Sequence, residues 1–503
     1  MSKRYVALVL GLLLLLSMVP FSAMAADDTF SLMVPLWYTE APTNETETIV
    51  RMGEIAGIKL DLQWTPSDGY QEKINTAIMS NVLPHAITVL DPKHSVYVNA
   101  ARAGMFWDLT EILKEMEVYG RIDPLIVSNA QLDGKNYYVP RTRMLTRAAV
   151  LYRKDWLEKL NLDPPKTMED VYAMAKAFTE LDPDGNGKDD TFGLISAYQT
   201  TGDIWGLGSA GVYMGAGQNY DIDADGNLIP TFETPEFQAM LDWYRRLYAE
   251  GLMNQDFATI RQEKGFEMIA AGQGGIAMAQ SDELENRFDA LVKLVQSETG
   301  VENLQILDIL GFNARIEAPD GEIGIIGGSG FYGGYAFPKT TVTSEEQLRA
   351  LLKAIDGFDS PAGQDIIQWG IEGVHHEVID GIPVLFEDQQ KWITDCCTLQ
   401  QIGPTFFTSK LYKQGVRTPV QEAYMTDQAF NAQYAVGDPT VPLISDTNTL
   451  KGGELKLILG DAYVKYIMGE IDQAGLRAEF DKWYAQGGTQ IVQEFNDGYA
   501  LIK

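Results

Sequence analysis

Cysteine, histidine and basic residues are scarce in this chain of 503 residues. Its two cysteines, Cys396 and Cys397, are adjacent, which excludes a disulfide framework and a zinc ribbon. Lysine and arginine number 39 against 70 acidic residues, so the formal net charge is −31. That charge opposes binding to nucleic acid or to an anionic membrane surface, because both need a basic protein surface. It also favours neutral ligands over polyanionic ones.

Sequence patterns of catalysis are absent as well. The chain has no nucleophile elbow, no phosphate-binding loop of the GxxxxGK[ST] type and no HExxH. The histidines include the adjacent pair His375 and His376, which could suggest a metal site. Adjacent side chains point in different directions on both a strand and a helix, however, so the pair would not converge on one ion. We therefore interpret the four histidines as structural or ligand-shell residues.

Only one long apolar run occurs, and it lies at the start of the chain. Lys3 and Arg4 precede an apolar stretch over residues 6–20, and Ala23-Met24-Ala25 follows as a small-x-small cleavage site. This order predicts a signal peptide over residues 1–25 and an exported protein, periplasmic or extracellular. A membrane anchor is the alternative, which the shortness of the run disfavours. No cysteine lies near the cleavage site, so we expect no lipid anchor.

After this segment the sequence alternates between strand and helix patterns. Strands are predicted at residues 30–37, 58–64 and 86–90, with helices at 45–55 and 67–81 between them. This order indicates an α/β fold with a parallel sheet covered by helices on both sides. Ligands of such sheets bind at loops after the strands, and these loops begin near Trp37-Tyr38, Thr65 and Asp91.

A second α/β set starts near Ala149. Capping patterns predict helices from Thr167 to about Thr179, from Thr234-Pro235 to Gly251, and from Ser344 to Ile355. Glycines cluster over residues 327–334, where a hinge or a close ligand approach would need them.

One loop has the spacing of calcium ligands. Positions 1, 3, 5 and 9 of an EF-hand loop carry oxygen side chains here, position 7 offers a backbone carbonyl, and glycine occupies position 6; the ligands would be Asp182, Asp184, Asn186, Lys188 and Asp190. Position 12, normally a bidentate Glu, is Gly193. The alternative is a tight Asp/Gly/Asn turn between helix and strand. We interpret the loop as a structural Ca²⁺ site, and the similar stretch at residues 221–227 as a hairpin turn.

The adjacent cysteines leave two possibilities open. They form either a strained vicinal disulfide or two reduced, buried side chains. Adjacent Cα atoms lie about 3.8 Å apart, below the usual range for a disulfide, so a disulfide here would be strained.

Short segments spread along the chain carry a family resemblance. They are YQEKIN at 70–75, GKNYYVPR at 134–141, RKDWLEKL at 153–160, LYAEGL at 247–252, WGIEGVHH at 369–376, YIMG at 466–469 and FDKW at 480–483. In this order and spacing, together with the DPDGNGKDD loop, they resemble the family-one extracellular solute-binding proteins of carbohydrate ABC transporters. The large lipoprotein-A-like branch is the most similar. The lipid-attachment cysteine common in that family has no counterpart here.

The resemblance implies a two-lobed periplasmic-binding-protein fold of type 2 with a ligand cleft between the lobes. The first lobe is expected at residues 26–144 and about 336–395, and the second at 145–335 and about 396–503. The chain would cross between them near residues 141–149, 327–335 and 392–397. The resemblance further implies a monomer that closes around a sugar or oligosaccharide and delivers it to a membrane permease.

Candidate ligand-binding residues follow from sugar chemistry and from the implied cleft. Aromatic rings stack on the C–H faces of sugars, and polar groups bond the hydroxyls. Residues that end strands or lie on the implied crossings are the candidates: Trp37, Tyr38, Glu40, Asp91, Arg141, Arg143, Trp205, Phe331 and Tyr332. The acidity of the chain favours neutral sugars, whereas Arg141 and Arg143 would pair with a ligand carboxylate. Other tryptophans on helical patterns, such as Trp156, are assigned to the core.

Two other functions remain open. An exported enzyme on the same two-lobed scaffold would use Cys396 or Cys397 as a nucleophile beside a carboxylate of the cleft. A binding or sensor protein for peptides or other solutes would need the cleft but no permease.

Overall fold

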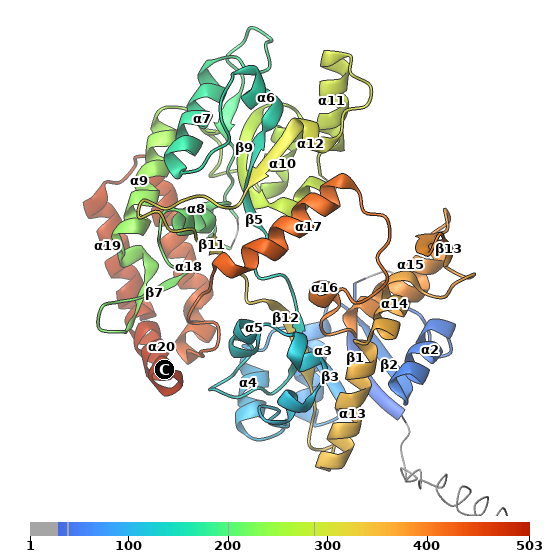
Figure 1. The fold of residues 1–503 in the computed structure, drawn as a ribbon. Coiled ribbons are helices and arrows are strands. Elements are labelled where there is room, and N and C mark those ends of the chain that lie inside the picture. Colours follow the sequence, from blue (N-terminus) through green and yellow to red (C-terminus); the bar gives the residue numbers. More distant parts are fainter. Residues whose placement is uncertain (1–28, 38–39, 200, 286) are drawn as a thin grey trace, which may run out of the picture.

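The computed structural model describes residues 29–37, 40–199, 201–285 and 287–503. The predicted signal peptide therefore lies outside the described residues. Two lobes, each built around its own β-sheet, lie one above the other in Figure 1. In the described part of the chain, no helix combines the length and apolarity needed to cross a membrane.

The first lobe is a five-stranded mixed sheet. Its order is β2 (Lys59–Pro66), β1 (Thr29–Leu36), β3 (Ala86–Val89), β12 (Phe331–Ala336) and β4 (Val139–Thr142). Strand β1 pairs in parallel with β2 and β3, whereas β12 is antiparallel to β3 and β4. The strands and helices predicted over the first 90 residues are confirmed. The other elements of this lobe are α2 (Glu47–Ala56), α3 (Tyr70–Ser80), α4 (Ser95–Arg102), α5 (Pro124–Asn129), α13 (Glu345–Phe358), α14 (Pro361–Trp369), α15 (Gln390–Cys396), α16 (Phe406–Ser409), β13 (His376–Ile379) and β14 (Ile382–Leu385).

Alternation along β1 explains why helices cover both faces of this sheet. Phe30 and Val34 point to one face, where α2 and α13 pack, and the Phe30 ring stacks on Phe358 at 6.1 Å. Met33 points to the other face, among side chains of α3 and α4. Because both faces are buried, the strand reads as an almost continuous apolar run.

The second lobe has a four-stranded sheet and most of the helices. Its strand order is β10 (Leu310–Asn313), β5 (Ala148–Arg153), β9 (Gly274–Gln280) and β6 (Phe192–Leu194), of which only β6 and β9 pair in parallel. The predicted capping box is confirmed: Thr167 and Asp170 cap the first turn of α7 reciprocally. The predicted hairpin turn is confirmed between β7 (Tyr220–Ile222) and β8 (Leu228–Pro230). The helices are α6 (Lys154–Lys159), α7 (Met168–Glu180), α8 (Leu207–Tyr213), α9 (Pro235–Ala249), α10 (Gln262–Ala270), α11 (Asp289–Thr299), α12 (Ile306–Ile309), α17 (Pro419–Asn431), α18 (Asp446–Ile467), α19 (Gln473–Trp483) and α20 (Thr489–Ile502).

The chain passes between the two sheets at three places. Residues 143–147 connect β4 to β5, residues 327–330 connect β11 (Ile325–Ile326) to β12, and residues 410–418 connect α16 to α17 (Figure 1). The first two crossings are hydrogen-bonded side by side, since Arg143 N donates to Gly330 O at 2.6 Å and Gly328 N donates to Leu145 O at 2.7 Å. Gly327 N also donates to Val436 O at 2.9 Å, next to the short pair of β11 with β15 (Ala435–Val436). Together these segments form a narrow connection between the lobes.

Two predicted boundaries are wrong. The third crossing was expected at residues 392–397, but Leu399 and Ile402 are buried in the core of the first lobe, so the crossing follows α16. The second lobe was expected to extend to Tyr335, which would include most of β12. This strand instead pairs with β3 and β4 of the first lobe. In both cases long-range strand pairing or apolar burial, rather than local pattern, decides which lobe holds the segment.

Candidate functional site

A cavity of about 1540 Å³ lies between the lobes and is called the interlobe cavity below. Its first-lobe wall includes Lys93, Phe331, Tyr332 and Phe407, and its second-lobe wall draws on β9, α8 and the C-terminal helices. Several glycines line it, at Gly202, Gly206, Gly208, Gly217, Gly327, Gly328, Gly452 and Gly453. The volume exceeds the roughly 300–1,000 Å³ of most small-molecule pockets, so it accommodates an extended ligand.

Tyr332 forms an aromatic platform on the first-lobe wall. The pairing of β12 with β4 shifts register between Phe331 and Gly334, which is a β-bulge. A bulge re-aims the side chain at its extra residue, and Tyr332 is 42% exposed although its strand is otherwise mostly buried. The Trp37 ring, 48% exposed, lies 6.2 Å from the Tyr332 ring at an angle of 49°. Two adjacent exposed rings are the arrangement that stacks on apolar ligand faces.

Arg143 lies beside this platform at the first crossing. Its guanidinium carbon is 4.0 Å from the centre of the Phe407 ring and 5.8 Å from that of Tyr332. Nη1 donates to Thr142 O at 2.8 Å, so the group is held in one orientation. Burial, and then the neighbouring Arg141, lowers the pKa of Arg143 to about 10. The side chain remains cationic at neutral pH.

A second group of polar residues lines the interlobe cavity around Asp438. Asp438 accepts from Asn219 Nδ2 at 2.8 Å and from the backbone and hydroxyl of Thr440. Lys93 reaches across from the first lobe and donates to Thr440 O at 2.9 Å. Burial lowers the pKa of Lys93, while Asp438 opposes that shift. This contact joins the two lobes beside the cavity.

The structure brings four of the nine predicted ligand residues to the cavity. Phe331, Tyr332, Arg143 and Trp205 line it, although Trp205 is only 8% exposed and mostly packs on Phe266 in the core. Trp37 joins the site through its contact with Tyr332. Among the other polar candidates, Glu40 is an exposed residue and no lining residue of the cavity, and Asp91 borders a separate small hollow of about 270 Å³. Tyr38 lies outside the described residues.

The prediction for Arg141 is wrong. Its side chain is fully buried, donating to the carbonyl of Tyr332 at 3.3 Å and to the side chain of Gln401. All four residues of β4 are buried, and Arg141 lies within this strand. Arg141 thus holds β12 and the turn at Gln401 together, whereas Arg143, past the strand end, reaches the cavity.

Several lining residues were not predicted. Phe407 lies in α16, which leads into the third crossing, Lys410 begins that crossing, and Tyr463 belongs to α18. Placing the third crossing correctly would have pointed to Phe407 and Lys410, because residues at crossings face the cleft in this architecture. Tyr463 sits in a helical apolar pattern that looks the same for core and cavity positions.

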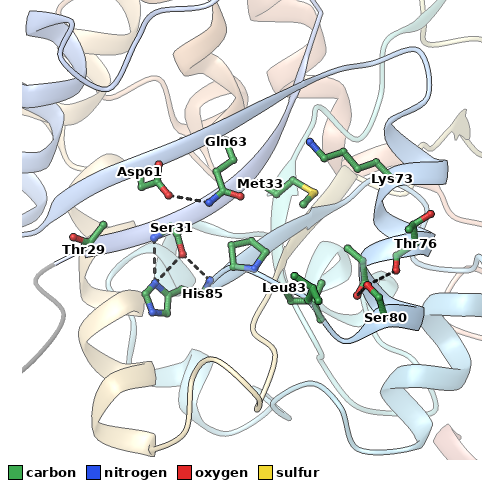
Figure 2. A pocket seen from close by; sticks show the side chains of 13 residues that line it. Thr29, Ser31, Met33, Asp61, Gln63, Lys73, Thr76, Ser80, Leu83 and His85 are labelled. Carbon is green, nitrogen blue, oxygen red and sulfur yellow. Dashed lines mark hydrogen bonds between the residues drawn. The ribbon is translucent and has the colours of Figure 1, made fainter.

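A second hollow, of about 700 Å³, lies on the first lobe beside β1, β2 and α3 (Figure 2). Its polar groups are already bonded to each other: Ser31 Oγ lies 3.0 Å from His85 Nδ1, and Gln63 Nε2 donates to Asp61 Oδ2 at 2.8 Å. Lys73 Nζ donates to the hydroxyl of Thr65 at 2.8 Å. A ligand there would have to break these bonds, so the interlobe cavity is the better candidate.

In the predicted calcium loop, the side chain of Asn186 bridges the carboxylates of Asp184 and Asp190. The Asn186 side-chain amide donates to Asp184 Oδ2 at 2.7 Å and to Asp190 Oδ1 at 3.0 Å. The carboxylate of Asp182 accepts from three backbone amides of the loop. Burial raises the pKa of Asp184, and the nearby charges of Asp190 and Asp182 add to the shift. Crowded carboxylates of this kind favour a cation.

The loop still differs from a complete EF-hand site. A Cβ on Gly193, the twelfth position, would lie 2.2 Å from Ala175 O, so no side chain fits there. Within the described residues, no three or more His, Cys, Asp or Glu side chains are already grouped as metal ligands. The carboxylate, amide and carbonyl oxygens of the loop are nevertheless of the type that binds a hard cation such as Ca²⁺. Binding would require the Asn186 side chain to give up its bonds to Asp184 and Asp190, and a water molecule would take the place of the missing twelfth ligand.

The geometry around Cys396 does not suit a nucleophile. The side chain is a free, buried thiol, and burial together with Asp395 raises its pKa. Reactive thiols instead need a lowered pKa. The neighbouring His375 has both nitrogens engaged, with Nε2 3.2 Å from Asp395 Oδ2 and Nδ1 accepting from Ile371 N at 2.9 Å.

The fold and the cavity together define a two-lobed binding protein with its ligand site between the lobes. The model of the bacterial extracellular solute-binding proteins matches residues 52–294. Lipoprotein LipO of Bacillus subtilis is 30% identical over 100% of this chain and 99% of its own length. The polygalacturonan/rhamnogalacturonan-binding protein YtcQ of the same organism is 31% identical over 94% of this chain and 91% of its own. The chain belongs to this family of solute-binding proteins.

Solved structures agree with this fold. An HMO-binding, ABC-transporter-associated solute-binding protein of Bifidobacterium longum infantis matches with a TM-score of 0.70 and 15% identity, over 95% of this chain and 99% of that one. The EF-hand mutant of the substrate-binding protein FusA of S. pneumoniae, in complex with fructo-nystose, matches with a TM-score of 0.58 and 18% identity, over 94% and 99% of the two chains. At these identities the likeness shows the fold alone.

Proposed function

We propose that this protein is the solute-binding component of an ABC importer and binds an oligosaccharide in the interlobe cavity. The observation that carries the proposal is the exposed ring pair of Tyr332 and Trp37 beside a cavity of about 1540 Å³. Rings of this kind stack on sugar faces, and the exposed side-chain amide of Asn219, which also lines the cavity, suits hydroxyl groups. Relatives named for polygalacturonan and fructooligosaccharide binding support a carbohydrate but leave its charge open.

A thermal-shift panel tests this function. Any ligand that binds only the folded state raises the melting temperature, by mass action. We expect a clear rise with one class of di- to tetrasaccharides and none with peptides or amino acids at the same concentration. A peptide that stabilises the protein while every saccharide fails would replace this function with peptide binding.

We further propose that closure of the lobes about the three crossings traps the ligand, and that the closed form docks on a membrane permease. The first lobe would comprise residues 29–142 and 331–409, and the second residues 148–326 and 419–503. A ligand favours closure only through its greater affinity for the closed state. The relation to an extracellular solute-binding family supports export and a binding role without catalysis. Absence of a lipid anchor stays a prediction, since the relative LipO is named a lipoprotein.

We propose a structural Ca²⁺ site at Asp182, Asp184, Asn186, Asp190 and the carbonyl of Lys188. The fold relative FusA is described as having an EF-hand, which supports this assignment. We expect Ca²⁺ to raise the melting temperature of chelator-treated protein, and Asp190→Asn to abolish that rise. Asp223→Asn, in the carboxylate-rich hairpin turn, serves as the matched control and should leave it intact. An equal response to Ca²⁺ in all three proteins would reduce the loop to a turn.

A further inference from the structure

The charged residues of the interlobe cavity are not balanced within it. Within the described part of the chain, its lining contains five cationic and three acidic side chains: Lys93, Arg143, Arg147, Lys410 and Lys456 against Asp203, Asp282 and Asp438. Three of the cations have acidic neighbours. Arg147 Nε donates to Asp282 Oδ1 at 3.1 Å, Lys456 Nζ lies 2.7 Å from Asp203 Oδ2, and Lys93 is attracted by Asp438. That leaves Arg143 and Lys410.

Arg143 is a partly buried cation whose neighbours are rings and other cations. Among the described residues, no carboxylate forms an ion pair with it, and the charges of Arg141 and Arg147 both act to lower its pKa. Phe407 packs against the flat face of the guanidinium at 4.0 Å. Nη1 donates to Thr142 O, and among the residues that the structure describes none bonds Nε or Nη2, so these two nitrogens remain as a fork for a planar acceptor.

Lys410 directly follows α16 at the start of the third crossing and is likewise partly buried. Its backbone is in the left-handed region, with φ of 47°, where α16 ends and the chain leaves the first lobe. Burial lowers the pKa of Lys410, and Arg417 adds to the shift, while Asp282 opposes it. Asp282 is already bonded to Arg147 and to Gln428 Nε2, at 3.2 Å in the second case. Asp282 is thus shared with Arg147, and among the described residues no carboxylate forms an ion pair with Lys410.

Holding cations away from water without a counter-ion costs stability, so such groups on a ligand cavity indicate an anionic ligand. A guanidinium with one stacked face and a free fork matches a planar carboxylate better than a tetrahedral sulfate ester. The stacking pair Tyr332 and Trp37 next to it suits a sugar ring. We propose that the ligand is an acidic oligosaccharide, an inference that rests on the proposed function. Arg143 binds the carboxylate of one uronate residue, and the charge of Lys410 stabilises a neighbouring carboxylate.

Matched probes test the charge of the ligand directly. Di- to tetramers of galacturonate, mannuronate and glucuronate are compared with methyl-esterified galacturonate oligomers and with neutral fructo- and galacto-oligosaccharides, by calorimetry and thermal shift. We expect at least one uronate series to bind, and its methyl ester or neutral counterpart to bind about tenfold or more weakly. If neutral oligosaccharides bind and uronates do not, the acidic ligand is refuted while the importer function stands. If no saccharide of either kind binds, both fail.

Variants then locate the carboxylate site. Arg143→Gln should weaken uronate binding about tenfold or more and leave any binding of the methyl ester unchanged, and Arg143→Lys should recover only part of the loss. Lys410→Gln should have a smaller effect of the same kind. Lys456→Gln removes the same charge from the same cavity, but this lysine already pairs with Asp203, so it is the matched control. Equal losses for Arg143→Gln and Lys456→Gln would refute a specific carboxylate site, and melting temperatures report whether each variant folds.

Discussion

Removal of the Tyr332 ring is the most direct test of how the cavity holds a sugar. A tyrosine side chain presents roughly 150–250 Å², and 42% of Tyr332 is exposed, which leaves about 60–100 Å² for a ligand to cover. At about 25 cal/mol per Å² of apolar surface, complete coverage is worth ~1.5–2.5 kcal/mol. A sugar that covers mainly one face recovers part of this. Tyr332→Ala should therefore weaken binding by ~1–2 kcal/mol, or about five- to thirtyfold.

Two control variants separate stacking from other effects. Tyr332→Phe keeps the ring and should bind within about twofold of the wild-type protein, because the hydroxyl adds little to stacking. Phe430→Ala removes a ring that is 52% exposed on α17 but does not line the cavity, and it should leave binding unchanged. Titration calorimetry with the oligosaccharide that gives the largest thermal shift measures all three. Wild-type affinity in a folded Tyr332→Ala protein would refute the platform.

Three further predictions concern stability and reactivity. Gly330 has φ of 76°, and a Cβ there would lie 2.4 Å from Ile126 Cγ1, so Gly330→Ala should lower the free energy of unfolding by ~2–4 kcal/mol. In contrast, Gly321→Ala, with φ of 88° and open space around it, should cost only ~1 kcal/mol in the same denaturant titration. Burial acts to raise the pKa of Glu494, but donors in the first turn of α18 lower it to about 2, so Glu494→Gln should cost ~1 kcal/mol at pH 7. Because the stabilisation by the carboxylate is lost as the pH falls from about 4.5 to about 2, the two proteins should converge in acid, and a constant difference would contradict the shift. The thiol of Cys396 should react with a thiol reagent only on unfolding, and Cys396→Ala should bind ligand normally; rapid labelling of the native protein would revive a nucleophilic role.

Local patterns in the sequence were enough for the elements but not for the cavity. The strands of the first lobe and the caps at Thr167, Thr234 and Ser344 follow from burial periodicity and from hydrogen bonds within four residues. The exposure of Tyr332 depends on a β-bulge between strands that are nearly 200 residues apart in the chain. The different fates of Arg141 and Arg143 depend on where β4 ends, because Arg141 lies within this fully buried strand and Arg143 is the first residue of the crossing that follows it. The exposure of these side chains therefore depends on the pairing of distant strands, which local sequence patterns do not encode.

The net charge of the chain and the charge of its cavity have opposite signs, and this contrast bears on the kind of anion that can bind. A net charge of −31 repels polyanions at the protein surface. That repulsion is screened beyond about 8 Å at physiological ionic strength, whereas Arg143 and Lys410 would act on a bound carboxylate at contact distance. A long polyanion carries its repelled charges along the outside of the protein. A short uronate oligomer, enclosed between the lobes, meets the two unpaired cations with few charges left outside. Acidity of the whole chain therefore does not exclude an acidic ligand; it favours short acidic oligomers over the polymers from which they come.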